Sequence, residues 1–307
     1  MKTKYRYAFQ EIDSCNFCGR RTEKNSVIGQ RMNSSQGMRP ERKSGISISV
    51  VKCEGCSLIY SNPQAIPFDI QDHYGIEPES YWEDDYFNSQ SNYFSWQIGR
   101  AKKFINFHDG MTALDIGAGI GKCMVALKNA GFITYGVEPS KQFWERAVAN
   151  LIVEEGHLKL AKIEEVQFPP ESFDFITFGA VLEHLYDPAE AIEKAVYWLK
   201  PNGIIQIEVP SSNWLIPKLV NFFYRIRGTR FVTNLSPMHE PYHLHEFHLT
   251  SFKRLGQRLN FTIKEWKYSV CKVYYFPTFI HPLLDWFMRK TSQGMQLTIW
   301  LGKDGKK

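Results

Sequence analysis

Three glycines at alternating positions, Gly117, Gly119 and Gly121, lie between a short apolar run and a segment of helical character. The run, residues 111–116, is typical of a buried strand, and residues 122–130 are typical of a helix. Glycine has no Cβ, so the backbone can turn sharply and a ligand can approach it closely. The first turn of the helix adds unpaired N–H groups and a partial positive charge. The arrangement predicts a loop that binds an electron-rich ligand.

An acidic residue stands at the end of the next predicted strand. Residues 133–137 form an apolar run, and Glu138 follows it, 21 positions after Gly117. A carboxylate at this place can accept hydrogen bonds from both hydroxyls of a ribose whose nucleoside lies on the glycine loop. The two features together predict a nucleoside-bearing ligand. A dinucleotide oxidoreductase shares them, so they do not identify the cofactor by themselves.

Four of the six cysteines form two Cys-x-x-Cys pairs, Cys15 with Cys18 and Cys53 with Cys56. Four thiolates at this spacing can close tetrahedrally around a structural zinc ion, which is the preferred interpretation. A redox-active dithiol is the alternative. The 34 residues between the pairs, 19–52, exceed what a compact finger needs and are rich in Arg, Ser and Gly. We expect a protruding loop there.

Strands and helices that alternate along the second part of the chain must position these side chains. Such alternation predicts an α/β fold with a parallel sheet covered on both faces and a ligand at the carboxyl ends of its strands. Two further strands near the end of the chain would complete a Rossmann-like, seven-stranded sheet with an antiparallel edge. The expected helices are 93–107, 122–130, 141–151, 188–199 and 277–290, and the expected strands are 111–116, 133–137, 158–163, 172–178, 204–209, 261–271 and 295–301.

The chain divides into three parts. Residues 1–66 are expected to form a zinc-knuckle module of the zinc-ribbon type, 67–108 a connecting helical segment, and 109–307 the α/β domain. An insertion at about 211–248 follows the fifth strand of that domain. Residues 64–92 are acidic and aromatic, and we expect them to connect the modules and to fold over the active site.

Five ordered motifs in the α/β part resemble those of one known family: LDIGAGIG (114–121), GVEPS (136–140), FDFIT (173–177), VLEHL (181–185) and LKPNG (199–203). Over residues 93–307 the chain resembles the class I S-adenosylmethionine-dependent methyltransferases. The cysteine pairs, followed by Asn62-Pro63 and a Tyr-rich acidic segment, resemble one branch whose members commonly act on sugars, glycans or natural products. The resemblance implies S-adenosylmethionine as cofactor and methyl transfer to a hydroxyl or amino group of such a small molecule, which includes sugar nucleotides and glycan precursors.

The resemblance also assigns the residues that bind the cofactor. Asp115 would support the glycine loop and meet the methionine ammonium through water, Glu138 would bind the ribose, and Pro139 would pack near the adenine. Many relatives have an adenine-binding acid where this chain has Lys162, so the adenine edge falls to the backbone of Ile163. The methionine portion and the reacting methyl are assigned to the remaining residues: Gly117, Ala118, Gly119, Gly121, Phe178 and Gly179. Taken singly, Asp115 could cap a turn and Glu138 could be a solvated strand end.

An oxygen acceptor with a high pKa needs a general base, for which histidine is the usual residue near neutral pH. His184 follows the fourth strand, and His243 and His245 precede the last strands. In an extended segment His243 and His245 would point to the same side. Family members often have a histidine of the active-site wall at the place of His243. Structural hydrogen bonding is the favoured role of His184 and His243, and a role in the active site is the alternative.

A divalent metal at these histidines is the less favoured interpretation. Glu183 and His184 resemble a metal-binding pair of small-RNA 2′-O-methyltransferases. Those enzymes have a second glutamate three positions earlier, where this chain has Ala180. We therefore assign no catalytic metal.

The insertion contains an irregular apolar segment, 214–231, in which aromatic and aliphatic residues are punctuated by Lys218, Arg225, Arg227 and Arg230. Such a segment suits a lid over a sugar nucleotide, because its rings can stack and its basic groups can pair with phosphate. The same pattern suits a helix that lies on a membrane surface. Plain packing or a dimer contact is a further alternative.

The overall composition limits the class of protein, the location and the partners that fit these motifs. The chain has 307 residues, of which 43% are hydrophobic and 22% charged, as in an ordinary soluble globular protein. It has no apolar run of the roughly 18 residues that a membrane-spanning helix needs, and no secretory signal follows Met1, so we expect a cytoplasmic location. The net charge of +5 is mild and does not by itself indicate a nucleic-acid partner.

Two rival functions stay open. An RNA methyltransferase would hold nucleic acid with the zinc module and with a cluster of basic residues between the cysteine pairs: Arg20, Arg21, Lys24, Arg31, Arg39, Arg42 and Lys43. A non-catalytic protein would bind a partner through the zinc module and use S-adenosylmethionine only as a regulator. A dehydrogenase is a more distant alternative.

Overall fold

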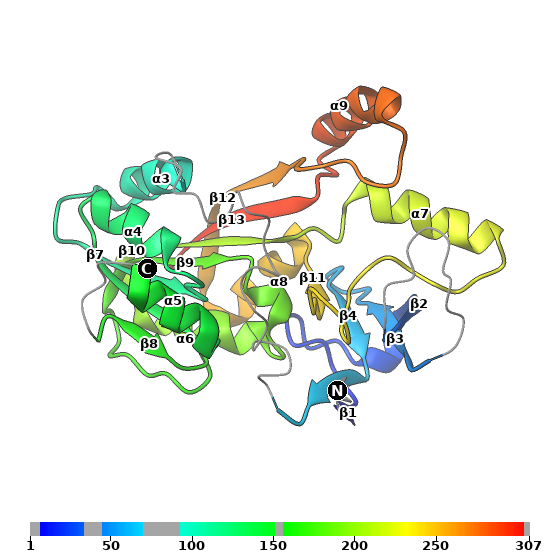
Figure 1. Ribbon diagram of the computed structural model, residues 1–307, viewed down its shortest axis with the longest axis horizontal. Helices are drawn as coiled ribbons and strands as arrows, with labels where there is room; N and C mark the ends of the chain where they lie inside the picture. Colours follow the sequence, from blue (N-terminus) through cyan, green and yellow to red (C-terminus); the bar gives the residue numbers. More distant parts are fainter. Residues whose placement is uncertain (1–6, 34–44, 70–92, 151–155, 304–307) are drawn as a thin grey trace.

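A seven-stranded sheet forms the centre of the molecule (Figure 1). The computed structural model describes residues 7–33, 45–69, 93–150 and 156–303. The sheet has the strand order β12-β13-β10-β9-β6-β7-β8. Its strands are β6 (Thr112–Ile116), β7 (Ile133–Glu138), β8 (Leu158–Leu160), β9 (Phe173–Gly179), β10 (Leu199–Pro210), β12 (Phe261–Ser269) and β13 (Gln296–Lys303).

Five neighbouring strands of this sheet, β10, β9, β6, β7 and β8, run parallel to one another. β13 is antiparallel to both of its neighbours, β10 and β12. The predicted α/β sheet with an antiparallel edge is therefore confirmed. The antiparallel strand lies one position inside that edge, because β12 pairs along its outer side.

Helices cover both faces of the sheet (Figure 1). The helices α3 (Ser95–Ile105) and α4 (Lys122–Asn129) share an apolar cluster with Ala113 of β6. The helices α6 (Pro188–Trp198) and α8 (Leu249–Leu259) share a different cluster with Leu114 and Ile116 of the same strand. Successive side chains of a strand point to opposite faces, so a strand buried on both sides is mainly apolar. A further helix, α5 (Lys141–Asn150), packs beside β7 and β8.

Asp174, near the start of β9, joins three strands at the amino end of the sheet. Its Oδ2 accepts hydrogen bonds from the Thr112 backbone N–H at 2.8 Å and from the Thr112 hydroxyl at 3.0 Å. The same oxygen accepts from Lys200 Nζ at 2.7 Å. Burial acts to raise the pKa of this carboxyl, but the hydrogen bonds from Lys200 and Thr112 lower it overall. The ionised carboxylate thus stabilises the junction of β6, β9 and β10.

The N-terminal module contains two small sheets. The strands β2 (Ser26–Met32), β3 (Ser47–Lys52) and β4 (Ile59–Asn62) are antiparallel neighbours, and β1 (Tyr7–Gln10) pairs with β5 (Gln64–Pro67). The protruding loop expected over residues 19–52 is therefore wrong for the part that the structure describes. Apolar side chains of β2 and β3, Met32, Ile48 and Val50 among them, are buried, so the two strands stay in the module as a hairpin.

The insertion after β10 fastens the N-terminal module to the α/β domain. Its strand β11 (His245–Glu246) pairs with β4 and extends the module's larger sheet to four strands. The Ser212 hydroxyl donates to the Ser57 carbonyl at 3.0 Å, and the Ser251 hydroxyl donates to the Cys56 carbonyl at 2.8 Å. Backbone and side chains of the two parts therefore share one continuous hydrogen-bonded seam.

Two helices extend away from the sheet (Figure 1). One is α7 (Leu215–Ile226), which forms the main part of the predicted irregular segment, and the other is α9 (His281–Thr291) between β12 and β13. Ile216, Val220 and Tyr224 of α7 share an apolar cluster with Met288 of α9. Among the described residues, no helix combines the length and the apolar character needed to cross a membrane.

Asp174→Asn should lower the free energy of unfolding by about 1–3 kcal/mol, because the neutral amide loses the ion pair with Lys200 and accepts weaker hydrogen bonds than the carboxylate does. Urea denaturation followed by circular dichroism measures the change. The matched control is Asp285→Asn on α9, whose ion pair with Arg289 is exposed and should leave the midpoint unchanged. Equal midpoints for wild type and Asp174→Asn would contradict this account of the junction.

Candidate functional site

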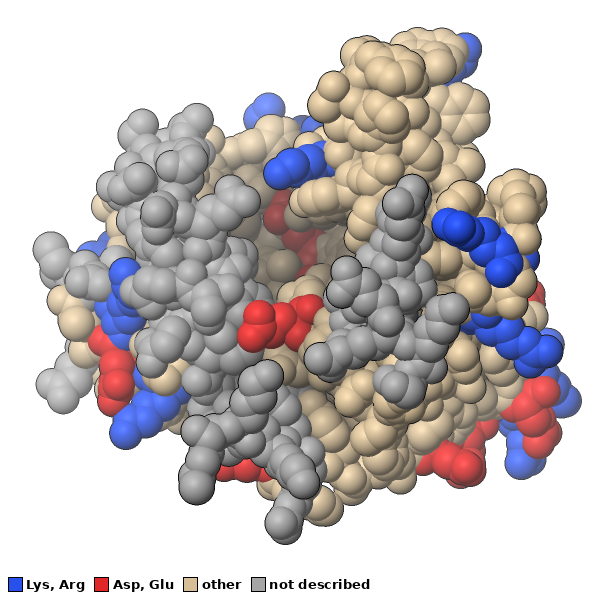
Figure 2. Space-filling model, turned by 45° about the vertical axis from the view of Figure 1, so that its right-hand side comes forward, with Lys and Arg blue, Asp and Glu red and all other residues tan. Residues whose placement is uncertain are grey.

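A cavity of about 1450 Å³ opens at the carboxyl ends of the parallel strands. This is the edge at which open α/β sheets bind their ligands. Residues at the ends of β6, β7, β9 and β10 and in the loops after them line it. Figure 2 shows the surface hollowed near the centre of the view, with acidic side chains inside the hollow. A site for one small ligand usually measures about 300–1,000 Å³, so this cavity has room for a cofactor and an acceptor together.

The glycine loop borders the cavity beside the end of β6. Gly117, Gly119 and Gly121 have φ angles of 70°, 55° and 80°, in the left-handed region that glycine adopts without strain. A Cβ at Gly117 would lie 2.5 Å from the side chain of Val181, which follows β9. The N–H groups of Gly117 and Ala118 donate to the Val137 carbonyl at 2.8 and 3.0 Å. The loop is thereby fixed to β7 and held open toward the cavity.

Two buried carboxyls lie at the strand ends next to this loop. Glu138, 5% exposed, accepts hydrogen bonds from Gly119 N–H at 2.7 Å and from Ser140 N–H at 2.8 Å. Burial raises its pKa to about 7 even though these two bonds favour the charged form. Burial also raises the pKa of Asp115 to about 7. Near neutral pH both groups can therefore become fully ionised when a hydroxyl-bearing or cationic ligand binds beside them.

Eight of the ten predicted cofactor residues line the cavity: Asp115, Gly117, Ala118, Gly119, Glu138, Pro139, Ile163 and Gly179. The other two do not. Gly121 is the residue from which α4 begins, and Phe178 is fully buried in the core of the sheet. Gly179 differs from Phe178 because a Cβ there would meet no atom within 4 Å. The end of β9 thus opens onto free space.

Glu183, His184 and His243 lie together on the wall of the cavity. The two imidazole rings meet edge to face with their centroids 4.9 Å apart. A carboxylate oxygen of Glu183 and one ring nitrogen of each histidine lie within 4.8 Å of one another. Burial lowers the pKa of His184 to about 4 and lowers the pKa of His243 well below its usual value. Both rings are therefore neutral near pH 7 and can accept a hydrogen bond from a ligand.

His245 lies apart from this group. It belongs to β11, is buried beside Phe247, and is not among the residues that line the cavity. The expectation that His243 and His245 point to the same side applied to an extended segment, and regular strand structure begins only at His245. His243 sits in the irregular segment before it, where its backbone N–H donates to the Ser236 hydroxyl at 3.1 Å.

Several residues of the cavity wall were missed by reasoning from the sequence. Glu208, near the end of β10, accepts hydrogen bonds from Gln97 Nε2 at 2.9 Å and from Gln296 Nε2 at 3.1 Å. A carboxylate near the end of a mainly apolar run, residues 204–209, was a signal that could have identified it. Residues 66–69 also line the cavity. They belong to the stretch 64–92 that we expected to fold over the active site, and the pairing of β5 with β1 brings them there.

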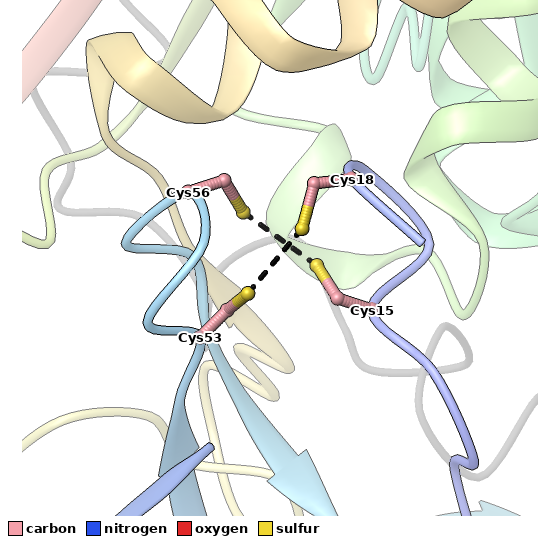
Figure 3. A group of neighbouring side chains, drawn as sticks. All are labelled: Cys15, Cys18, Cys53 and Cys56. Carbon is pink, nitrogen blue, oxygen red and sulfur yellow. Dashed lines mark hydrogen bonds between the residues drawn. The ribbon is translucent and has the colours of Figure 1, made fainter. Parts of the chain in front are cut away.

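The four knuckle cysteines converge as predicted (Figure 3). The Sγ atoms of Cys15 and Cys56 are 3.6 Å apart, and those of Cys18 and Cys53 are 3.4 Å apart. Tetrahedral zinc with bonds of about 2.3 Å requires sulfur–sulfur distances of about 3.8 Å. The donor set and its spacing therefore fit a four-thiolate zinc site after a small expansion.

The described basic residues between the knuckles are not all exposed. Arg31 is buried and donates to the Val232 carbonyl at 3.1 Å, whereas Arg20, which donates to the Lys24 carbonyl at 3.0 Å, is exposed. None of the described basic residues of this stretch lines the cavity. The rest of the cluster, Arg39, Arg42 and Lys43, lies outside the described residues.

Comparisons with known proteins agree with this geometry. The chain is 30% identical over 142 residues to a protein of Bradyrhizobium diazoefficiens named ubiquinone biosynthesis O-methyltransferase, a match that covers 45% of this chain and 53% of that protein. A Rhodopseudomonas palustris protein of the same name is 28% identical over 184 residues, which cover 55% and 70% of the two chains. The chain thus spans about half the length of some of the curated relatives it matches.

The fold and the family follow from two further matches. A putative S-adenosylmethionine-dependent methyltransferase of Listeria monocytogenes has the same fold, with a TM-score of 0.50 and 14% identity over 70% of this chain and 100% of that one. Residues 94–265, more than half of the chain, match the family described as "Methyltransferase domain". The chain therefore belongs to the class I S-adenosylmethionine-dependent methyltransferase family.

Proposed function

We propose that this protein transfers a methyl group from S-adenosylmethionine to a hydroxyl or amino group of a small molecule, such as a sugar, a glycan precursor or a natural product. The observation that carries the proposal is the buried Glu138 carboxylate, bound by the N–H groups of Gly119 and Ser140. It shares one cavity with the neutral pair His184 and His243. One region of the cavity thus suits a nucleoside, and another suits a nucleophile that must lose a proton.

The cofactor would be held by residues at the ends of β6, β7 and β9. Bound S-adenosylmethionine supplies an electrophilic methyl group on a sulfonium. Glu138 would bind the ribose hydroxyls, and Asp115 would meet the ammonium through water. Pro139 and the backbone of Ile163 would border the adenine. The free space beside Gly179 would admit the sulfonium end.

The chain itself would contribute alignment and proton removal. Methyl transfer from a sulfonium is an in-line displacement, so fixing the acceptor in line and excluding water supplies much of the acceleration. His243 would accept the proton of the acceptor as the new bond to carbon forms, and His184 would hold the ring of His243 in place across their edge-to-face contact. His245, which lies outside the cavity lining, would only position this segment.

The residues that enclose the cavity support a small-molecule acceptor. Residues 66–69 of the N-terminal module and His184 of the α/β domain line the same space, and an enclosure built from two modules suits a compact molecule. The matched relatives are named O-methyltransferases, which favours a hydroxyl as the acceptor. No described basic residue of the stretch between the knuckles reaches the cavity, so the site itself gives no support to an RNA acceptor.

We further propose that the four knuckle cysteines hold a structural zinc ion. Cys15 and Cys18 come from one knuckle and Cys53 and Cys56 from the other, so the ion would join two segments far apart in the sequence. The second knuckle leads into β4, which pairs with β11 two residues after His243. Zinc would therefore stabilise the wall of the cavity as well as the module.

Glu138→Gln should weaken the affinity for S-adenosylmethionine about 10- to 100-fold, because a hydrogen bond to a charged group is replaced by a weaker one. Isothermal titration calorimetry measures the dissociation constant. The matched control is Glu193→Gln on the exposed side of α6, which should bind as the wild type does. Unchanged affinity in a folded Glu138→Gln protein would show that the ribose is bound elsewhere.

The pH dependence of the same titration tests whether the charges of Asp115 and Glu138 contribute to the affinity for the cofactor. The pKa values of Asp115 and Glu138 are raised to about 7, and the cofactor would favour their ionised forms. Affinity should therefore be constant above about pH 7 and fall as the pH decreases below it. Glu138→Gln should show a shallower fall, since only Asp115 still titrates there.

His243→Asn should lower kcat about 10²- to 10⁴-fold, the usual contribution of a general base. The acceptor is found first by monitoring S-adenosylhomocysteine against sugar nucleotides, phenols and RNA. Cofactor affinity should stay unchanged, and the exposed His108→Asn control should keep full activity.

The pH profile of kcat gives a second test of His243. Burial lowers the pKa of its ring well below the usual value, so the ring stays neutral throughout the range in which an ordinary histidine becomes protonated. Protonation of His243 should therefore cause no fall in wild-type kcat between about pH 8 and about pH 6. Full kcat in His243→Asn would exclude the residue as the base.

Metal analysis of freshly purified protein should find about one zinc per chain. Cys18→Ser should lose the metal and melt at a lower temperature, whereas Cys271→Ser, at an exposed cysteine outside the cluster, should keep both. A chelator should reproduce the Cys18→Ser melting curve in the wild type and leave that of Cys18→Ser unchanged. Stoichiometric loss of metal without any change in melting temperature would contradict the structural role.

A further inference from the structure

The helices α7 and α9 expose large apolar side chains as they extend from the sheet (Figure 1). Ile226 on α7 is 69% exposed, and Phe279, just before α9, is 82% exposed. Residues 219–226 and 274–287 together contribute ten of the 20 large hydrophobic side chains that are exposed among the described residues: Leu219, Phe222, Phe223, Ile226, Tyr274, Tyr275, Phe279, Leu283, Trp286 and Phe287. Single exposed apolar residues are ordinary, but a concentration of this kind marks an interaction surface.

The exposed residues follow helical spacing, so each helix has a second apolar face. On α7 the exposed Leu219, Phe222 and Ile226 recur at intervals of three and four residues. They are distinct from the buried residues of the same helix, which pack toward Met288 of α9. On α9 the exposed Leu283 and Trp286 recur in the same way. Internal packing of the two helices therefore leaves these outer faces uncovered.

Basic residues accompany the two apolar faces. Residues 214–231 contain four basic residues and no acidic one: Lys218, Arg225, Arg227 and Arg230. Residues 272–290 contain Lys272, Arg289 and Lys290 against a single acid, Asp285, which is paired with Arg289 at 2.7 Å. The combined surface thus has a clear positive excess, and its complement is an anionic partner.

Two of the cations stand directly over exposed rings. Lys290 Nζ lies 5.0 Å from the centre of the Trp286 ring, and the Arg227 guanidinium lies 5.2 Å from the centre of the Phe223 ring. Lys290 follows Leu283 by seven residues, so it belongs to the apolar face of α9 itself. The core of a protein–protein interface is depleted of lysine. At a lipid surface, by contrast, a lysine can bury its stem and keep its charge among the headgroups.

We propose that α7 and α9 form a docking surface for an anionic phospholipid bilayer, with their exposed apolar residues inserted at the headgroup level and their basic residues paired with lipid phosphates. Contact is peripheral and is made by the outer faces of both helices. The residues from which these helices extend, Pro210 before α7 and Cys271 and Met295 around α9, line the cavity. Docking would therefore hold the cavity close to the lipid surface.

Flotation of the purified full-length protein with vesicles tests the proposal without cofactor or acceptor, so the result is independent of methyl transfer. One set of vesicles contains phosphatidylcholine alone and the other contains phosphatidylcholine with phosphatidylglycerol. The protein should float with the anionic vesicles, bind the neutral ones at least about fivefold more weakly, and be released as salt is added. Equal binding to both vesicle types, or no binding to either at low salt, would overturn the proposal.

Paired substitutions separate the apolar from the electrostatic contribution. Phe222→Ser with Phe279→Ser should lower the partition coefficient at least about tenfold. Arg227→Gln with Lys290→Gln should lower it about fivefold for each charge removed, and only on anionic vesicles. The matched control is Tyr197→Ser on α6, an exposed aromatic residue on a different part of the molecule, which should bind as the wild type does. Wild-type binding by the Phe222/Phe279 double variant would overturn the proposal.

The rival occupant of this surface is a second copy of the chain. Light scattering after gel filtration of the same proteins decides between the two. A wild-type dimer that dissociates in the Phe222/Phe279 double variant and does not float with vesicles would assign the surface to self-association and overturn the membrane proposal. A monomer that binds anionic vesicles supports it.

Discussion

Glu138 is an ionisable residue buried at the end of a strand, where two backbone N–H groups, those of Gly119 and Ser140, compensate for the lost water. A buried carboxylate is costly unless such donors are in place. The left-handed turn at Gly119 and the end of β7 bring these donors to it. The glycine loop and the end of β7 are therefore held together by the same carboxylate, and both border the cavity.

The second part of the site depends on the seam between the two modules. β11 pairs with β4, and the Leu244 N–H donates to the Glu183 carbonyl at 2.6 Å. One short segment thus touches both the N-terminal module and the turn that carries His184. This explains how His243 comes to lie against His184 although the two are 59 positions apart in the sequence. The knuckle cysteines act on the cavity through the same segment.

Much of the sheet and of the cofactor region could be predicted from the sequence, because local patterns determine them. Apolar runs bounded by glycine indicated the parallel strands, and the end of such a run identified Glu138. Features set by contacts between distant segments could not be predicted in this way. The β2–β3 hairpin depends on pairing within the N-terminal module, and the different surroundings of His243 and His245 depend on the pairing of β11 with β4 across the two modules. The side chain of Phe178, which the resemblance assigned to the reacting methyl, is buried in the core and does not line the cavity.

Calorimetric titration of the wild-type protein with S-adenosylmethionine, and separately with NAD, tests the central claim most directly. The glycine loop and Glu138 alone are compatible with either nucleotide. The account predicts saturable binding of S-adenosylmethionine at one site per chain and no detectable heat from NAD. Binding of NAD at this site, or the absence of S-adenosylmethionine binding by folded protein, would contradict it.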